Sequence, residues 1–166
     1  MTTVTQPLRE EHKELLPHIE SFRTAADAIG SAPTDMVRRQ IDEVYAFLLH
    51  HLLPHAQDEE QALYPVVGKV MGAPEATGTK SRDHIEVGRL TEELGSLRMQ
   101  LAEGTTAESR AQELRRVLYG LYALVKVHFA KEEEVYLPIL DARLSPDEAH
   151  AMFAAMEAAA GHAKAT

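Results

Sequence analysis

A histidine followed four residues later by a glutamate occurs twice in this chain, within two segments that align without gaps. The first segment, HAQDEEQALYP, begins at residue 55, and the second, HFAKEEEVYLP, begins at residue 128. The aligned pairs are His55 with His128, Glu59 with Glu132, Glu60 with Glu133 and Pro65 with Pro138. On a helix, side chains four residues apart share one face. Each segment is therefore predicted to point an imidazole and a carboxylate at one metal ion or one proton.

The similarity extends upstream of both segments. Glu11-His12 precedes the first segment and Asp83-His84 precedes the second. From 55 to 128 is 73 residues, and from 12 to 84 is 72. The chain thus consists of two similar halves, each with a lone histidine followed by a His-x-x-x-Glu motif, and such a repeat constrains the fold more than any other feature.

The composition limits the classes of protein that remain. A length of 166 residues with 45% hydrophobic content suits one domain over 1–166, and the low aromatic content of 5% favours helices. A net charge of −9 argues against nucleic-acid and anionic-membrane partners. The absence of cysteine excludes thiolate-bound metals and disulfides. No stretch is apolar over the length of a membrane span, so we expect a cytoplasmic protein.

Apolar residues at helical spacing predict four long helices. They are expected to begin near Thr5 or Pro7, at Thr34, near Lys80 and near Ala107, and the first, third and fourth to end near Ile29, Ala102 and Leu140. Residues 72–78 are expected to form a loop. A capping box at Ser145 to Glu148 opens a short fifth helix over about 146–160. Helix kinks are expected at Pro17 and at Pro54.

Four long helices joined by short links predict an all-α, up-down-up-down four-helix bundle with a core over about residues 8–140. Six candidate metal ligands lie within the apolar faces: His12, His55, Glu59, His84, His128 and Glu132. Buried carboxylates must be paired or bound to metal, and no Lys or Arg recurs on these faces in a matching pattern. A dinuclear site of iron, manganese or zinc would satisfy all six groups, with Glu59 and Glu132 bridging and two histidines on each metal.

A lone histidine followed by His-x-x-x-Glu, repeated over four helices, resembles the hemerythrin-like HHE domain. The segments LREEHKELLPHIE and HFAKEEEVYLP are similar in sequence to mycobacterial hemerythrin-like proteins. The resemblance covers about residues 8–140 and implies two iron ions with an oxo or hydroxo bridge. It also implies small-molecule partners, because members of the family bind O2, sense oxygen or iron, or react with H2O2 or nitric oxide. We expect a monomer or a weak dimer.

Two positions depart from the oxygen-carrying members of this family. Those proteins have a second histidine one turn after the one on their third helix, where this chain has Gly88. They also have a carboxylate five residues after the last histidine; here Glu132 stands at four and Glu133 at five. The resemblance therefore disfavours reversible O2 carriage by this chain.

Several other residues are weighed as replacement ligands. His18 and His51 are candidates, as is a phenolate from Tyr45, Tyr64, Tyr119 or Tyr122, and the sequence does not choose among them. We assign no role in the site to His50, His150 and His162, and we expect Glu60, Glu133 and Glu134 to form a solvated face. The leading hypothesis for the function is a peroxidase- or catalase-like oxidoreductase. The alternative is a protein that binds or senses O2, nitric oxide or iron without turnover.

Overall fold

The computed structural model describes the backbone of residues 3–165 and the side chains of residues 3–161. All regular structure in this part of the chain is helical, which confirms the predicted all-α class. The α-helices are α1 (Gln6–Ala28), α2 (Thr34–Phe47), α3 (Leu53–Asp58), α4 (Tyr64–Met71), α5 (Gly78–Ala102), α6 (Ala111–Lys131), α7 (Leu137–Arg143) and α8 (Pro146–Ala165). Two 3-10 turns, η3 (Pro74–Thr77) and η4 (Glu108–Arg110), precede α5 and α6.

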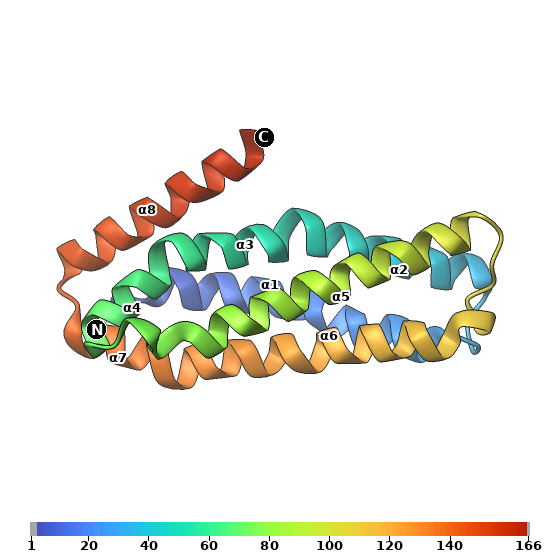
Figure 1. Cartoon of the computed structure of the whole chain (residues 1–166), viewed down its shortest axis with the longest axis horizontal. Coiled ribbons are helices and arrows are strands. Elements are labelled where there is room, and N and C mark those ends of the chain that lie inside the picture. The colour runs from blue at the N-terminus through green and yellow to red at the C-terminus, as the bar shows by residue number, and fades with distance from the viewer. Residues whose placement is uncertain (1–2, 166) are drawn as a thin grey trace.

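Three π-helical segments join several of these helices end to end. They are η1 (Leu48–Leu52), η2 (Glu59–Leu63) and η5 (Glu132–Tyr136). Residues 34–71 therefore form one long rod, and residues 111–143 form another. With α1 and α5 they make a bundle in which α1 packs on α2 and α6, and α5 packs on the same two helices. Figure 1 shows the four rods side by side, with α8 lying obliquely across one end.

The predicted helix bounds differ from the structure mainly at the C-terminus. The last helix was expected to be short and to end near residue 160, but α8 extends to Ala165. Residues 107–110 lie outside the α-helix that was predicted to begin there, because η4 precedes α6. Helix α1 continues through Pro17 without interruption.

Each π-helical segment is followed by one residue and then by a proline. The residue before the proline donates its N–H to the carbonyl five positions earlier: Leu53 to Leu48, Tyr64 to Glu59 and Leu137 to Glu132. In an α-helix, the proline ring would clash with the carbonyl four residues before it. The wider turn relieves that clash. The irregularity expected at Pro54 is thus a π-turn, and Pro65 and Pro138 have the same effect in the two repeats.

Two apolar clusters fill the bundle, one on each side of the candidate ligands. The larger contains Phe22 of α1, Leu48 of η1 and Leu118 of α6, all fully buried. The smaller contains Leu8, Leu63 and Leu137, with Met152 and Met156 contributed by α8. Polar side chains between the two clusters are therefore shielded from solvent along the bundle axis.

Helix α8 covers η2 and α3 and completes the smaller apolar cluster. The predicted capping box opens it: the Glu148 carboxylate accepts from the Ser145 backbone N–H at 2.9 Å, and Ser145 Oγ accepts from the Glu148 N–H at 3.3 Å. Within the described residues, no helix is both long enough and apolar enough to cross a membrane.

The capping box yields a first prediction. Replacing Ser145 with alanine removes the cap and should lower the free energy of unfolding by about 1 kcal/mol. Urea denaturation measures the loss, and amide hydrogen exchange should show it first in the N-terminal turns of α8. Ser96→Ala is the matched control, because the Ser96 hydroxyl bonds only to the carbonyl of Glu92 inside α5. A loss in the control as large as that of Ser145→Ala would contradict the assignment.

Candidate metal centre

The four predicted histidines come from four different rods and meet at the middle of the bundle. His12 lies on α1, His55 on α3, His84 on α5 and His128 on α6. All except His84 are buried; its side chain retains 11% of its exposure. The predicted carboxylates Glu59 and Glu132 are each the first residue of a π-segment, and both are completely buried. The structure thus brings all six predicted ligands together.

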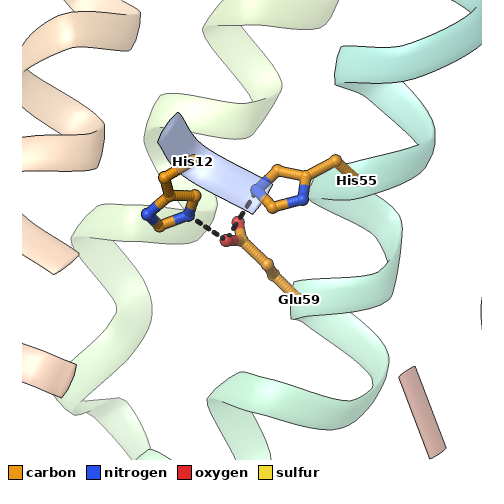
Figure 2. A group of neighbouring side chains, drawn as sticks. All are labelled: His12, His55 and Glu59. Atoms are coloured by element: carbon orange, nitrogen blue, oxygen red, sulfur yellow. Dashed lines mark ion pairs between the residues drawn. The ribbon is translucent and has the colours of Figure 1, made fainter. Parts of the chain in front are cut away.

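Glu59 lies between two pairs of histidines. Its Oε1 is 3.0 Å from His55 Nε2 and 3.7 Å from His12 Nε2 (Figure 2). Its Oε2 is 3.1 Å from His84 Nε2 and 3.6 Å from His128 Nε2. Two groups of potential metal ligands therefore share this one carboxylate, and each group takes its histidines from one half of the repeat.

Glu132 also spans both histidine pairs, but it has additional partners. Its Oε2 is 3.4 Å from His12 Nε2, and its Oε1 is 3.1 Å from His128 Nε2. The same Oε1 is 3.1 Å from the ammonium of Lys80 and accepts a 2.9 Å hydrogen bond from the Tyr64 hydroxyl. The charge of Glu132 is thus partly balanced by protein groups.

Lys80 is a single buried cation beside the ligand cluster, although no Lys or Arg recurs there in a matching pattern. Its side chain is fully buried, and its Nζ also donates to the His128 carbonyl oxygen at 2.6 Å. Burial lowers the pKa of Lys80, and the charge of Glu132 offsets only part of that effect. Lys80 stands four residues before His84, so the i, i+4 spacing was the signal that could have placed it beside the site. It was missed because only recurring cations were considered.

Tyr64 is the tyrosine that the structure places at the site. Its hydroxyl oxygen is 3.3 Å from His84 Nε2, 3.4 Å from His128 Nε2 and 3.4 Å from Glu59 Oε2. Burial, followed by the charges of Glu59 and Glu132, raises its pKa far above the usual value, so the phenol stays protonated in the metal-free site.

The other candidate ligands lie elsewhere. Tyr119 donates to Asp27, Tyr122 contacts Glu20 and Lys126, and Tyr45 packs against Gly95 and Arg98. His18 and His51 both stack on Phe47, with ring centroids 4.7 and 5.7 Å away. His50 and His150 are exposed and join neither ligand group, whereas the side chain of His162 falls outside the described residues.

A carboxylate holds the outer nitrogen of every site histidine. The Nδ1–carboxylate pairs are His55 with Glu11 at 2.9 Å, His128 with Asp83 at 3.1 Å, His84 with Glu60 at 2.8 Å and His12 with Glu133 at 2.8 Å. Glu60 and Glu134 are exposed and Glu133 is half-buried, so the expectation of a solvated face holds in part, but Glu60 and Glu133 also hold site histidines. Carboxylates at this position fix the tautomer and orientation of metal-binding histidines.

These outer pairs follow the repeat. The acid before each lone histidine reaches the motif histidine of its own half, and the second glutamate of each motif reaches the lone histidine of the other half. With Nδ1 donating outward, each Nε2 lone pair points at the centre. Because the same acidic positions recur in both halves, the Nε2 atoms of all four imidazoles face the centre.

Four atoms at the centre have no hydrogen-bond partner among the described residues. They are His12 Nε2, His55 Nε2, Glu59 Oε1 and Glu132 Oε2, all buried. Unsatisfied buried acceptors of this kind are costly unless a cation lies between them. The donor set, nitrogen and carboxylate oxygen converging from four helices, therefore fits metal ions.

The buried carboxylates shift the pKa values of the histidines beside them. Burial alone would lower the pKa of His128, but hydrogen bonds to Glu132 and Glu59 and their charges outweigh it and raise the pKa to about 9. The same balance, led by the charge of Glu59, raises the pKa of His55 well above its usual value. Burial opposes ionisation of Glu59, yet the neighbouring histidines hold its pKa well below the usual range. The surroundings of Glu59 therefore favour its charged form, which is the form that binds cations.

The twofold similarity breaks down next to the carboxylates. At the offsets of the repeat, Tyr64 corresponds to Leu137 and Lys80 to Leu8. Both leucines are buried in the smaller apolar cluster. The Lys80 ammonium therefore contacts Glu132, whereas the Tyr64 hydroxyl lies 2.9 Å from Glu132 Oε1 and 3.4 Å from Glu59 Oε2. The equivalent positions in the other half, Leu8 and Leu137, offer neither a cation nor a hydroxyl.

Comparison with known proteins identifies the class. The hemerythrin HHE cation-binding domain matches residues 3–140. The chain belongs to this family, whose domains bind metal ions, typically iron, and the buried His/Glu cluster fits that property. Neither the curated proteins nor the solved structures contain a significant match to this chain.

The outer carboxylates lead to a second prediction. Glu11→Ala removes the partner of His55 Nδ1 and should weaken metal binding by about 10- to 100-fold. Metal titration against a competing chelator measures the change. Glu10→Ala is the control. Glu10 is next to Glu11 in the chain, but its carboxylate is exposed and accepts a hydrogen bond from Gln6 rather than from a site histidine. Equal affinities for the two variants would contradict an orienting role for Glu11.

Lys80 leads to a third prediction. In the metal-free protein, Lys80→Met leaves Glu132 without its buried cation and should cost about 3–5 kcal/mol of stability. Loading with metal should recover much of this loss, because the metal then compensates the carboxylate. Denaturant unfolding with and without metal tests this. Lys126→Met, which breaks a solvent-exposed pair with Glu20, should change stability little in both forms, because water screens that pair. A Lys80→Met loss that metal leaves unchanged would argue against the assignment.

Proposed function

We propose that this chain is a non-haem di-iron protein that reacts with small oxidants as a peroxidase- or catalase-like oxidoreductase. The observation that supports it best is Glu59, whose two oxygens each face a different pair of histidine Nε2 atoms. Nitrogen and oxygen donors without thiolate suit iron. A dinuclear centre explains why the ligand motif is duplicated.

Each residue of the cluster has a place in this proposal. His12 and His55 would hold one ion and His84 and His128 the other, while Glu59 and Glu132 bridge them and an oxo or hydroxo group completes the pair. The proposal includes an up-down-up-down order for the four rods, a single domain over residues 1–166, and a cytoplasmic monomer or weak dimer.

Protein groups around the centre would supply the other requirements of the reaction. Two iron ions, when bound, would supply the two electrons that, with two protons, reduce H2O2 to two molecules of water. A second H2O2, itself oxidised to O2, or an external reductant such as nitric oxide would return those electrons. The Tyr64 hydroxyl and the Lys80 ammonium hold protons 2.9 and 3.1 Å from Glu132 Oε1. The apolar clusters on both sides keep bulk water out.

Gly88 supports reaction over reversible O2 carriage. A Cβ at this position would meet no atom within 4 Å, so the backbone there has room for a side chain but carries none. A centre with one fewer imidazole keeps a coordination position for an outside molecule. Direct binding of peroxide is then possible.

Metal content tests the cofactor. Protein expressed with ample iron should contain about two irons per chain and show the absorption bands of an oxo-bridged ferric pair. Glu59→Ala or Glu132→Ala should abolish these bands and lower the melting temperature, because metal stabilises only the folded state. One zinc per chain, or a Glu132→Ala protein with full iron and an unchanged spectrum, would contradict this part.

Turnover tests the activity. Consumption of H2O2 with and without nitric oxide should exceed that of the metal-free protein and of His84→Ala. If the iron protein turns over neither compound, yet binds and releases O2 or nitric oxide repeatedly, the alternative of a binding or sensing protein holds instead.

A further inference from the structure

Two surface pockets occupy equivalent positions in the two halves of the repeat. One, of about 410 Å³, lies between α3 and α5 above His84. The other, of about 400 Å³, lies between α1 and α6 above His12. At the offsets of the repeat, Leu53 and Ile85 of the first pocket correspond to Lys126 and Lys13 of the second. The pockets therefore share a position in the fold but differ in chemistry.

The floors of the two pockets differ at one residue. Phe129 stacks on the His12 ring at 4.3 Å with an interplanar angle of 15°, and the His12 side chain is only 2% exposed. The equivalent residue above His84 is Ala56, which is too small to cover the ring. His84 is accordingly the most exposed of the four site histidines, at 11%.

Charge distinguishes the pockets as well. Lys13, Lys126 and Arg9 line the pocket above His12, and Arg9 forms an ion pair with Glu133 across it. Above His84, the position of Arg9 is taken by Ser81, whose hydroxyl donates to Glu60 at 2.8 Å. The His84 pocket lacks a cationic side chain among its lining residues and is bounded mainly by apolar groups.

A smaller cavity lies beside the His84 pocket. Its volume is about 10 Å³, close to one water-sized sphere, and it shares Ala56 and His84 with the outer pocket. His55 and His128 also line it, so it touches histidines from both ligand groups. Phe129 lines both this cavity and the equivalent pocket of the other half. A path inward from the His84 pocket would therefore run past Ala56 and His84, whereas a path from the other pocket would run past the Phe129 ring.

We propose that the pocket above His84 is the port through which small uncharged molecules reach the metal centre, and that Phe129 closes the equivalent path above His12. This inference rests on the proposed function in one respect: it takes H2O2, nitric oxide or O2 as the molecules admitted. An apolar passage without cations favours such neutral guests over anions.

Nitric oxide binding to the reduced iron protein tests the port by stopped-flow absorbance, without requiring turnover. Ala56→Phe gives the His84 side the residue that covers His12 and should slow association by about tenfold or more. Because Ala56 is buried and the larger ring can disturb folding, Ile85→Trp at the exposed rim is a second variant with the same expected direction. Lys13→Trp, at the position equivalent to Ile85, should leave the rate within about twofold of wild type.

The outcomes separate the port from the function. Unchanged rates in Ala56→Phe and Ile85→Trp, or a slower rate in Lys13→Trp than in these two, overturn the port. Modification of the metal-free protein by diethyl pyrocarbonate, mapped by mass spectrometry, is independent of iron: His84 should react faster than His12 in wild type, and Ala56→Phe should remove that difference. Equal reactivity of the two histidines in wild type would also overturn the port. A chain that binds no iron but shows the predicted modification pattern contradicts only the proposed function.

Discussion

The burial of Glu59 and Glu132 is the constraint on which the rest of the structure depends. Two carboxylates with no solvent exposure need positive partners. The histidines around them do not fully meet this need, because the Nδ1 atom of each already pairs with another carboxylate. A net excess of acidic groups in the middle of an apolar bundle favours the binding of cations. If the six side chains hold metal as proposed, they would couple metal binding to folding.

The two halves of the sequence repeat give the site an approximate twofold symmetry. The two sides of the site differ where equivalent residues in the two halves differ. All four histidines and both glutamates obey the twofold relation, as do the acids that orient the imidazoles. Tyr64, Lys80 and Ala56 do not, since their counterparts are Leu137, Leu8 and Phe129. The His84 side of the centre thereby gains proton-bearing groups and an uncovered imidazole ring, whereas on the other side Phe129 stacks on the His12 ring beneath a pocket lined by cations.

The repeat was sufficient to predict the helical class and the six clustered residues, because residues spaced three or four apart lie on the same face of a helix. It did not predict Lys80, since one buried cation leaves no periodic signal. The role of Glu60 and Glu133 was also missed. Each follows a motif glutamate in the sequence, but the histidine that it contacts belongs to the other half of the repeat, and sequence spacing does not show that contact. Tyr64 could be selected only from its position after a π-turn, which is not visible in an α-helical pattern.

The π-turns have a consequence for how the site could have arisen. A π-turn is equivalent to one extra residue in an α-helix, so every side chain beyond it is rotated by about 100° from its α-helical direction. In the rods of residues 34–71 and 111–143, the side chains before and after a π-turn therefore face the bundle independently of one another. Apolar residues beyond a π-turn can therefore be substituted without changing the direction of the histidine and glutamate before it. The proline after each π-turn favours this rotation in both halves of the repeat.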